Sequence, residues 1–178
     1  MIVVGILARP DASNVMEIAR RAASDDSKVQ VAGVVPGDAG WDRALFELTA
    51  AGVGHATVVR SAKGSMEPAD LELALRYLPD IRAVVLVRPP ARLLAAAIAG
   101  ADFAGASLVV VGPLDDESLA ALEQRTGAAA PIILDPPARD PDGTFAGFVA
   151  ALATRLDAGD PPDAAFRATV AKLAVDPA

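Results

Sequence analysis

The sequence predicts an α/β protein, a three-layer α/β/α sandwich in which one mostly parallel sheet of about six strands lies between helices. Two observations support this prediction. Six short runs rich in apolar and β-branched residues lack polar alternation, which is typical of strands covered on both faces. Segments with helical periodicity alternate with these runs over short connections, which favours parallel strands joined by right-handed crossovers.

The predicted strands share a high content of Val, Ile and Leu and contain no charged residue. They are residues 2–7, 29–35, 56–59, 83–87, 107–111 and 131–134.

The predicted helices place apolar residues three and four positions apart. The first can be capped by Ser13 and has Val15, Ile18 and Ala22 on one side. The last starts at Pro162, because proline is favoured in the first turn of a helix. Between them, helices are predicted over 41–51, 67–78, 91–99, 117–124 and 144–156, and the last runs over 162–174.

The chain is expected to form a single α/β domain over residues 1–178. Its 178 residues match a prior of about 150 residues for one domain. The stretch 136–143 is the richest in turn-forming residues, but its short length favours a loop over a domain boundary.

Charge and composition exclude several classes of function. Lys and Arg number 16 against 23 Asp and Glu, giving a net charge of −7, so binding to nucleic acid or to an anionic membrane is not expected. The absence of cysteine excludes disulfides, thiolate nucleophiles and zinc–thiolate sites. His55 is the only histidine. The N-terminus lacks the features of an export signal, which predicts a cytoplasmic protein.

Polar residues after the predicted strands are the candidates for a ligand site, because ligands bind beyond the carboxyl ends of parallel strands. Gly37-Asp38-Ala39-Gly40 opens a helix and could offer amides to a phosphate. It lacks the Lys-Ser/Thr of a P-loop, so a tight turn is the simpler interpretation. No GxGxxG motif for binding a dinucleotide occurs, so the motifs of the sequence predict no nucleotide cofactor.

Two acidic groups could suggest a metal, but each has a simpler explanation. Asp115 and its acidic neighbours lie where a helix should begin, and negative charge there is stabilised by the helix dipole. Asp135, Asp140 and Asp142 lie on one loop, where Asp is an ordinary turn residue. No metal site is predicted.

Several segments recur in an order typical of one enzyme family. Asn14-Val15 opens a helix, Gly37-Asp38 follows a strand, and Asp142 precedes Gly147 in a helix start. This order resembles the ribokinase/PfkB family of sugar and nucleoside kinases. The resemblance implies a ribokinase-like (Rossmann-like) fold, with Asp142 at the position of the catalytic base. It also implies that Asn14, Gly37 and Asp38 lie near the substrate.

The departures from that family pattern concern the phosphate site. The family has Gly-Ala-Gly before its catalytic Asp, and the glycine amides form an anion hole. Here Arg139, Asp140 and Pro141 stand in those places. Proline has no amide hydrogen, and Asp140 puts negative charge where phosphate would gather. The β lid and the strands around ATP also have no counterpart of sufficient length, and Arg9-Pro10 stands where the family has a sugar-binding Asp.

These losses predict a shortened, non-catalytic ribokinase-like protein that acts as a small-molecule-binding, regulatory or assembly module, with no cofactor. One alternative is a kinase of a small sugar or nucleoside that uses ATP and magnesium, with Asp142 as base. In this kinase Arg88, Arg139 or a magnesium ion on Asp135 and Asp140 would replace the phosphate cradle. Another alternative is a domain that binds adenosine or a flavin nucleotide.

A homo-oligomer, most simply a dimer, is also expected. Loss of flanking elements would leave apolar helix faces such as residues 91–99 incompletely covered, and a second copy could bury them.

Overall fold

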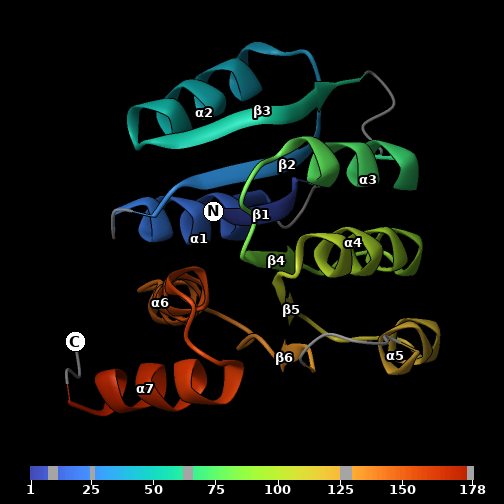
Figure 1. Cartoon of the computed structure of the whole chain (residues 1–178). Coiled ribbons are helices and arrows are strands. Elements are labelled where there is room, and N and C mark those ends of the chain that lie inside the picture. Colours follow the sequence, from blue (N-terminus) through green and yellow to red (C-terminus); the bar gives the residue numbers. More distant parts are fainter. Residues whose placement is uncertain (8–11, 25–26, 62–65, 125–129, 176–178) are drawn as a thin grey trace.

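The computed structural model describes residues 1–7, 12–24, 27–61, 66–124 and 130–175 (Figure 1). Strands and helices alternate along the chain until two helices end it. The elements are β1 (Ile2–Leu7), α1 (Ala12–Ser24), β2 (Val29–Val35), α2 (Ala39–Ala50), β3 (Val53–Arg60), α3 (Pro68–Tyr77), β4 (Ala83–Val87), α4 (Ala91–Ala104), β5 (Ser107–Val111), α5 (Asp116–Glu123), β6 (Ile132–Leu134), α6 (Thr144–Ala158) and α7 (Pro162–Val175).

The described strands form one parallel sheet in the order β3-β2-β1-β4-β5-β6, which confirms the predicted fold class. From β1 the chain adds β2 and β3 on one side and then crosses to β4 on the other. The direction of winding therefore reverses between β1 and β4. Such a switch point opens a crevice at the carboxyl edge of the sheet, where ligands of α/β proteins bind.

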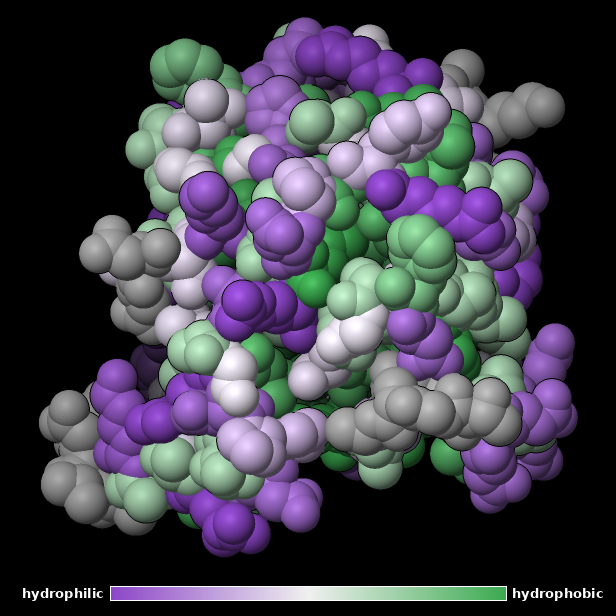
Figure 2. Space-filling model, viewed as in Figure 1, coloured by the Kyte–Doolittle hydropathy of each residue, from purple (hydrophilic) through white to green (hydrophobic). Residues whose placement is uncertain are grey.

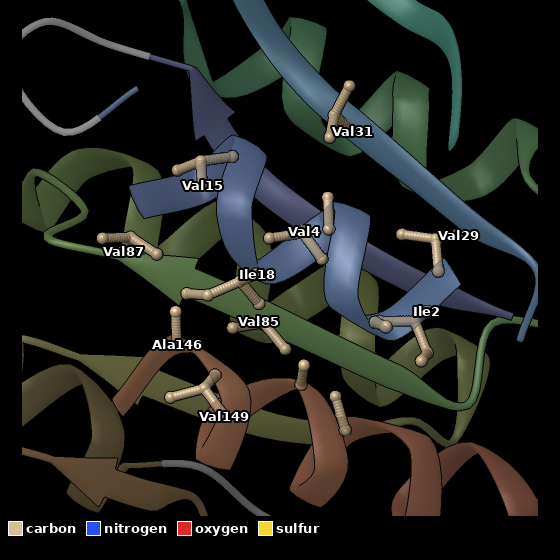
Figure 3. Close-up of a cluster of buried hydrophobic side chains, with 14 of the residues drawn as sticks. Ile2, Val4, Val15, Ile18, Val29, Val31, Val85, Val87, Ala146 and Val149 are labelled. Carbon is tan, nitrogen blue, oxygen red and sulfur yellow. The ribbon is translucent and has the colours of Figure 1, made fainter. Parts of the chain in front are cut away.

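Alternate residues of each central strand enter two separate cores. Ile2 and Val4 of β1 pack with Ile18 of α1 and Val149 of α6 in the first core (Figure 3). The intervening Val3 packs in the second core with residues of α3, α4 and α5. Both faces of the sheet are thus covered, which explains why the strand sequences lack polar alternation. Helix α7 packs beside α6, where the Phe166 ring meets that of Phe148 edge to face at 5.7 Å.

Strand β3 is longer than predicted, because it includes Val53, Gly54 and His55 at its start. Gly54 was expected to precede the strand, but it lies within β3, and its lack of a side chain leaves room for a residue of the neighbouring strand. Gln30 lies opposite it on β2, and a Cβ atom at position 54 would overlap the Gln30 amide group. The Nε2 atom of His55 lies at hydrogen-bond distance, 3.0 Å, from the Thr49 hydroxyl.

The expectation that the face of residues 91–99 is incompletely covered was wrong. Leu93, Leu94 and Ala97 of α4 are 2%, 0% and 0% exposed and pack in the second core with α3 and the sheet. The hydrophobic side of the helix is covered by its own chain, so this face gives no reason for a dimer. A homodimer remains a prediction without that support.

Large hydrophobic residues are exposed on strands as well as on helices, and three of them, Phe166, Val170 and Leu173, lie four and three positions apart on α7. Phe46, Tyr77 and Phe103 are 73%, 79% and 75% exposed and belong to α2, α3 and α4. On the face seen in Figure 2, hydrophobic residues are visible between hydrophilic ones. None of the helices in the described part of the chain combines the length and apolar character needed to cross a membrane.

Close packing of α4 on α3 predicts a position-specific cost at Gly100. A Cβ atom there would lie 2.9 Å from the Cβ atom of buried Leu75, closer than side chains allow. Gly100→Val is expected to lower the free energy of unfolding by roughly 2 kcal/mol, within the range for overpacked cores. Urea denaturation measures this change. Ala99→Val, at the exposed neighbouring position, is the control and should cost less than about 1 kcal/mol. Equal costs at the two positions would contradict the packing described.

Candidate functional site

A cavity of about 310 Å³ opens at the carboxyl edge of the sheet. Its walls come from the ends of β4 and β5, the loop after β6, and the first turns of α1 and α6. The lining residues are Asn14, Ile18, Val87, Arg88, Val111, Pro136, Pro137, Ala138, Arg139, Asp140, Phe145 and Ala146. We call it the sheet-edge cavity. It lies next to the switch point, at the place where the topology predicts a ligand site.

Arg88 enters this cavity from a strained backbone position directly after β4. Its φ is 45°, in the left-handed region that non-glycine residues rarely adopt. The Arg88 amide donates to the Val111 carbonyl at 2.7 Å, which fixes this conformation against the end of β5. Gly112 makes room for the side chain, because a Cβ atom there would lie 2.7 Å from Arg88 Cγ. A strained backbone that is fixed at the carboxyl edge of the sheet, where ligands bind, points to a functional residue.

The carboxylate of Asp140, a residue of the preceding loop, caps the start of α6. Oδ1 accepts from the Phe145 amide at 3.1 Å and Oδ2 from the Ala146 amide at 3.0 Å. Gly143, the residue before α6, has no side chain to cap the helix, so Asp140 supplies the cap from further back in the loop. Two of the amides that could bind an external anion are therefore already bound to a charge of this chain.

The four predicted site residues do not all line one cavity. Asn14 lines the sheet-edge cavity. Gly37 and Asp38 line neither this cavity nor the one described below; Asp38 caps α2 by accepting from the Trp41 amide at 3.0 Å. This hydrogen bond is the one expected of a turn that starts a helix. Asp142 faces a different cavity.

No family model matches the sequence, and no curated protein does. Solved structures do resemble it. A PfkB protein from Polaromonas sp. JS666 has 16% identity and a TM-score of 0.61, covering 86% of this chain and 81% of that one. Arabidopsis thaliana ribokinase, in complex with ribose and ATP, has 16% identity and a TM-score of 0.60, covering 89% and 78%. Aminoimidazole riboside kinase from Salmonella enterica has 13% identity and a TM-score of 0.58, covering 88% and 80%.

The fold is ribokinase-like. This confirms the fold that the sequence resemblance implied, and at such low identity the likeness extends to the fold alone. Within the described residues, every strand belongs to the single sheet, and α1 begins within a few residues of the end of β1. The described part of the chain between α5 and α6 holds one short strand, β6. Both observations agree with the expectation of a shortened ribokinase-like chain. Arg9-Pro10 lies outside the described residues.

A second cavity, of about 270 Å³, lies between α1, α6 and α7 and includes Asp142. Arg21 of α1 reaches across to this loop, where Nη2 donates to the Asp142 carbonyl at 3.3 Å. Glu17 holds the same guanidinium through Oε1, which accepts from Nε at 2.6 Å. Partial burial would raise the pKa of Glu17, but hydrogen bonds and charge from Arg21 and Arg20 outweigh it and lower the pKa. Arg21 thus ties α1 to the loop that carries Asp142.

The predicted capping role of Asp115 is confirmed. Its carboxylate accepts from the Ser118 amide at 2.8 Å at the start of α5. Hydrogen bonds from Ser118 lower the pKa of this exposed carboxyl. Among the described residues, no three His, Cys, Asp or Glu side chains gather into a group that could hold a metal ion.

Sequence reasoning placed the charge of Asp140 near the start of α6 but did not foresee its two hydrogen bonds. It also treated Arg88 only as a possible phosphate ligand, because a left-handed residue has no signature in the sequence. The neighbouring signals were Pro89-Pro90, which stop the strand, and Gly112 at the end of the next strand.

Removing the Asp140 carboxylate should destabilise α6. Asp140→Ala leaves the Phe145 and Ala146 amides without their acceptor, and lost helix caps cost roughly 1 kcal/mol. Urea denaturation of the variant measures this loss. Asp142→Ala removes an exposed carboxylate from the same loop and is the control, with an expected change within about 0.5 kcal/mol. A control that destabilises as much as Asp140→Ala would show that the cap is not the cause.

Proposed function

We propose that this chain is a non-catalytic ribokinase-like protein that binds a small molecule in the sheet-edge cavity and uses no cofactor. The observation that supports the proposal most strongly is the hydrogen-bonded Asp140 carboxylate at the start of α6. Asp140 also lines the sheet-edge cavity, so the helix N-terminus that could stabilise a transferring phosphate beside this cavity is occupied.

Electrostatics make this position unfavourable for phosphoryl transfer. Enzymes of that class act almost entirely by positioning the phosphate and stabilising its negative charge. A phosphate oxygen brought to the Phe145 and Ala146 amides would approach the Asp140 carboxylate. Two like charges about 4 Å apart repel by roughly 4 kcal/mol at an effective dielectric constant near 20. The repulsion opposes the stabilisation that catalysis requires.

The position of the candidate base also favours a non-catalytic protein. A general base must lie within hydrogen-bond reach of the proton it removes. Asp142 faces the cavity between α1, α6 and α7, whereas Asn14 faces the sheet-edge cavity. The residues implied for substrate binding and for proton removal thus line separate cavities.

A kinase is the second candidate, and two observations favour it. The similar solved structures include an Arabidopsis ribokinase complexed with ribose and ATP. Arg88 and Arg139 also line the sheet-edge cavity, where their positive charges could replace a missing phosphate cradle. This candidate still needs a base for the substrate hydroxyl, and Asp142 is the residue that would serve.

An ATP-consumption assay separates the two candidates. We expect the protein, with ATP, magnesium and a panel of sugars and nucleosides, to release no ADP above the rate without protein. The rate is measured for the unchanged chain and for Asp142→Asn. Sugar- or nucleoside-dependent turnover that Asp142→Asn abolishes would contradict the proposal and establish the kinase.

A further inference from the structure

Strand β3 is an edge strand, and none of the described strands pairs with its outer side. It contains eight residues, whereas β6 at the opposite edge contains three. The Ser61 amide, just after β3, donates to the Val35 carbonyl of β2 at 3.0 Å. Because successive amides of a strand point to opposite sides, those of Arg60 and Val58 point away from β2. An edge of this kind can pair with another strand.

Helix α2 lies beside β3 and exposes a phenylalanine on the side that faces this strand (Figure 1). Asp42, Phe46 and Thr49 are four and three positions apart, so they share one side of the helix. Asp42 forms an ion pair of 2.6 Å with Arg60 at the carboxyl end of β3. The Thr49 hydroxyl lies 3.0 Å from Nε2 of His55, near the amino end of the strand. Phe46 lies between these two contacts and is 73% exposed.

The other face of the same edge also exposes apolar surface. Val59 is paired with Val34, whose side chain belongs to the second core, whereas α2 packs in the first core. The side chain of Val59 therefore lies on the face of the sheet opposite α2, and Val59 is 46% exposed. A strand added to β3 would have hydrophobic side chains close to it on both faces, which stabilises strand pairing.

The charges of α2 and β3 suit a partner surface with no net charge. The two elements carry two acidic and two basic residues, so their charges sum to zero. These residues form two ion pairs within the chain, Asp42–Arg60 at 2.6 Å and Arg43–Glu47 at 3.0 Å. The net charge of −7 therefore lies elsewhere on the chain. Two copies of this surface can meet without the repulsion that acidic surfaces would cause.

We propose that β3 is the interface of a homodimer, in which the β3 strands of two copies pair antiparallel about a two-fold axis. Such an axis makes both copies use the same surface, and antiparallel pairing lets outward amides of one edge meet carbonyls of the other. It also brings the exposed Phe46 of each copy toward the interface. Among the described strands, the three-residue β6 offers few hydrogen bonds, so a second β3 is the better match. The two six-stranded sheets would then form one continuous sheet.

Sedimentation analysis of the unchanged chain and of surface variants tests this dimer. We expect the unchanged chain to have twice the monomer mass at micromolar concentration. Phe46→Glu should weaken the dimer by at least about a hundredfold, because each copy loses an aromatic contact and gains a repelling charge. Phe103→Glu is the matched control and should leave the dimer unchanged. Phe103 is 75% exposed and belongs to α4, which packs in the second core.

A second variant tests the other face of the edge. Val59→Lys places a positive charge beside the paired strands, and lysine on an edge strand opposes pairing. This variant is also expected to dissociate the dimer. Both substitutions lie at exposed positions, so circular dichroism and the midpoint of urea denaturation should show an intact fold.

The outcomes that would refute the proposal are equally specific. One is a chain that stays monomeric at all concentrations up to roughly 100 μM. Another is a dimer that both Phe46→Glu and Val59→Lys leave intact, or that Phe103→Glu weakens as much as they do. Growth into open-ended species would refute the two-fold arrangement, because β3 would then pair with a different surface. The proposed ligand binding in the sheet-edge cavity would stand in each case, since Phe46 and Val59 do not line that cavity.

Discussion

At the N-terminal end of α6, the amides of Phe145 and Ala146 point toward a carboxylate that the same chain supplies. A helix start of this kind offers donors and a favourable dipole to any anion nearby. Because Asp140 is part of the chain, its effective concentration at these donors does not depend on a ligand, and an external phosphate must displace it. This internal contact stabilises the helix and also restricts which molecules can use the cavity beside it.

The parallel sheet determines where this contact lies. Winding from β1 in two directions leaves the carboxyl edge open between β1 and β4, and the loops after β4 and β6 border the opening. Both faces of the sheet are closed by buried side chains of the helices. The layers thus hold Arg88, with its strained backbone, and Asp140, with its two hydrogen bonds, in the lining of one small space.

The strands could be predicted from sequence because a run such as 83–87 is apolar throughout, as a doubly covered strand must be. The start of β3 was missed because Gly54 resembles a turn residue, although it makes room for Gln30. The covering of residues 91–99 could not be predicted, since periodicity identifies an apolar face but not the element opposite it. For the same reason, the motif resemblance located Asp142 along the chain but not the cavity it faces.

With Asp140 in place, the start of α6 is expected to accept no phosphate from a nucleotide. The most direct measurement is a crystal structure of the protein grown or soaked with a non-hydrolysable ATP analogue and magnesium. The expected result is that Asp140 keeps its hydrogen bonds to the Phe145 and Ala146 amides, and that no phosphate oxygen lies within hydrogen-bond distance of them. A terminal phosphate bound to those two amides, with the Asp140 carboxylate displaced, would contradict it.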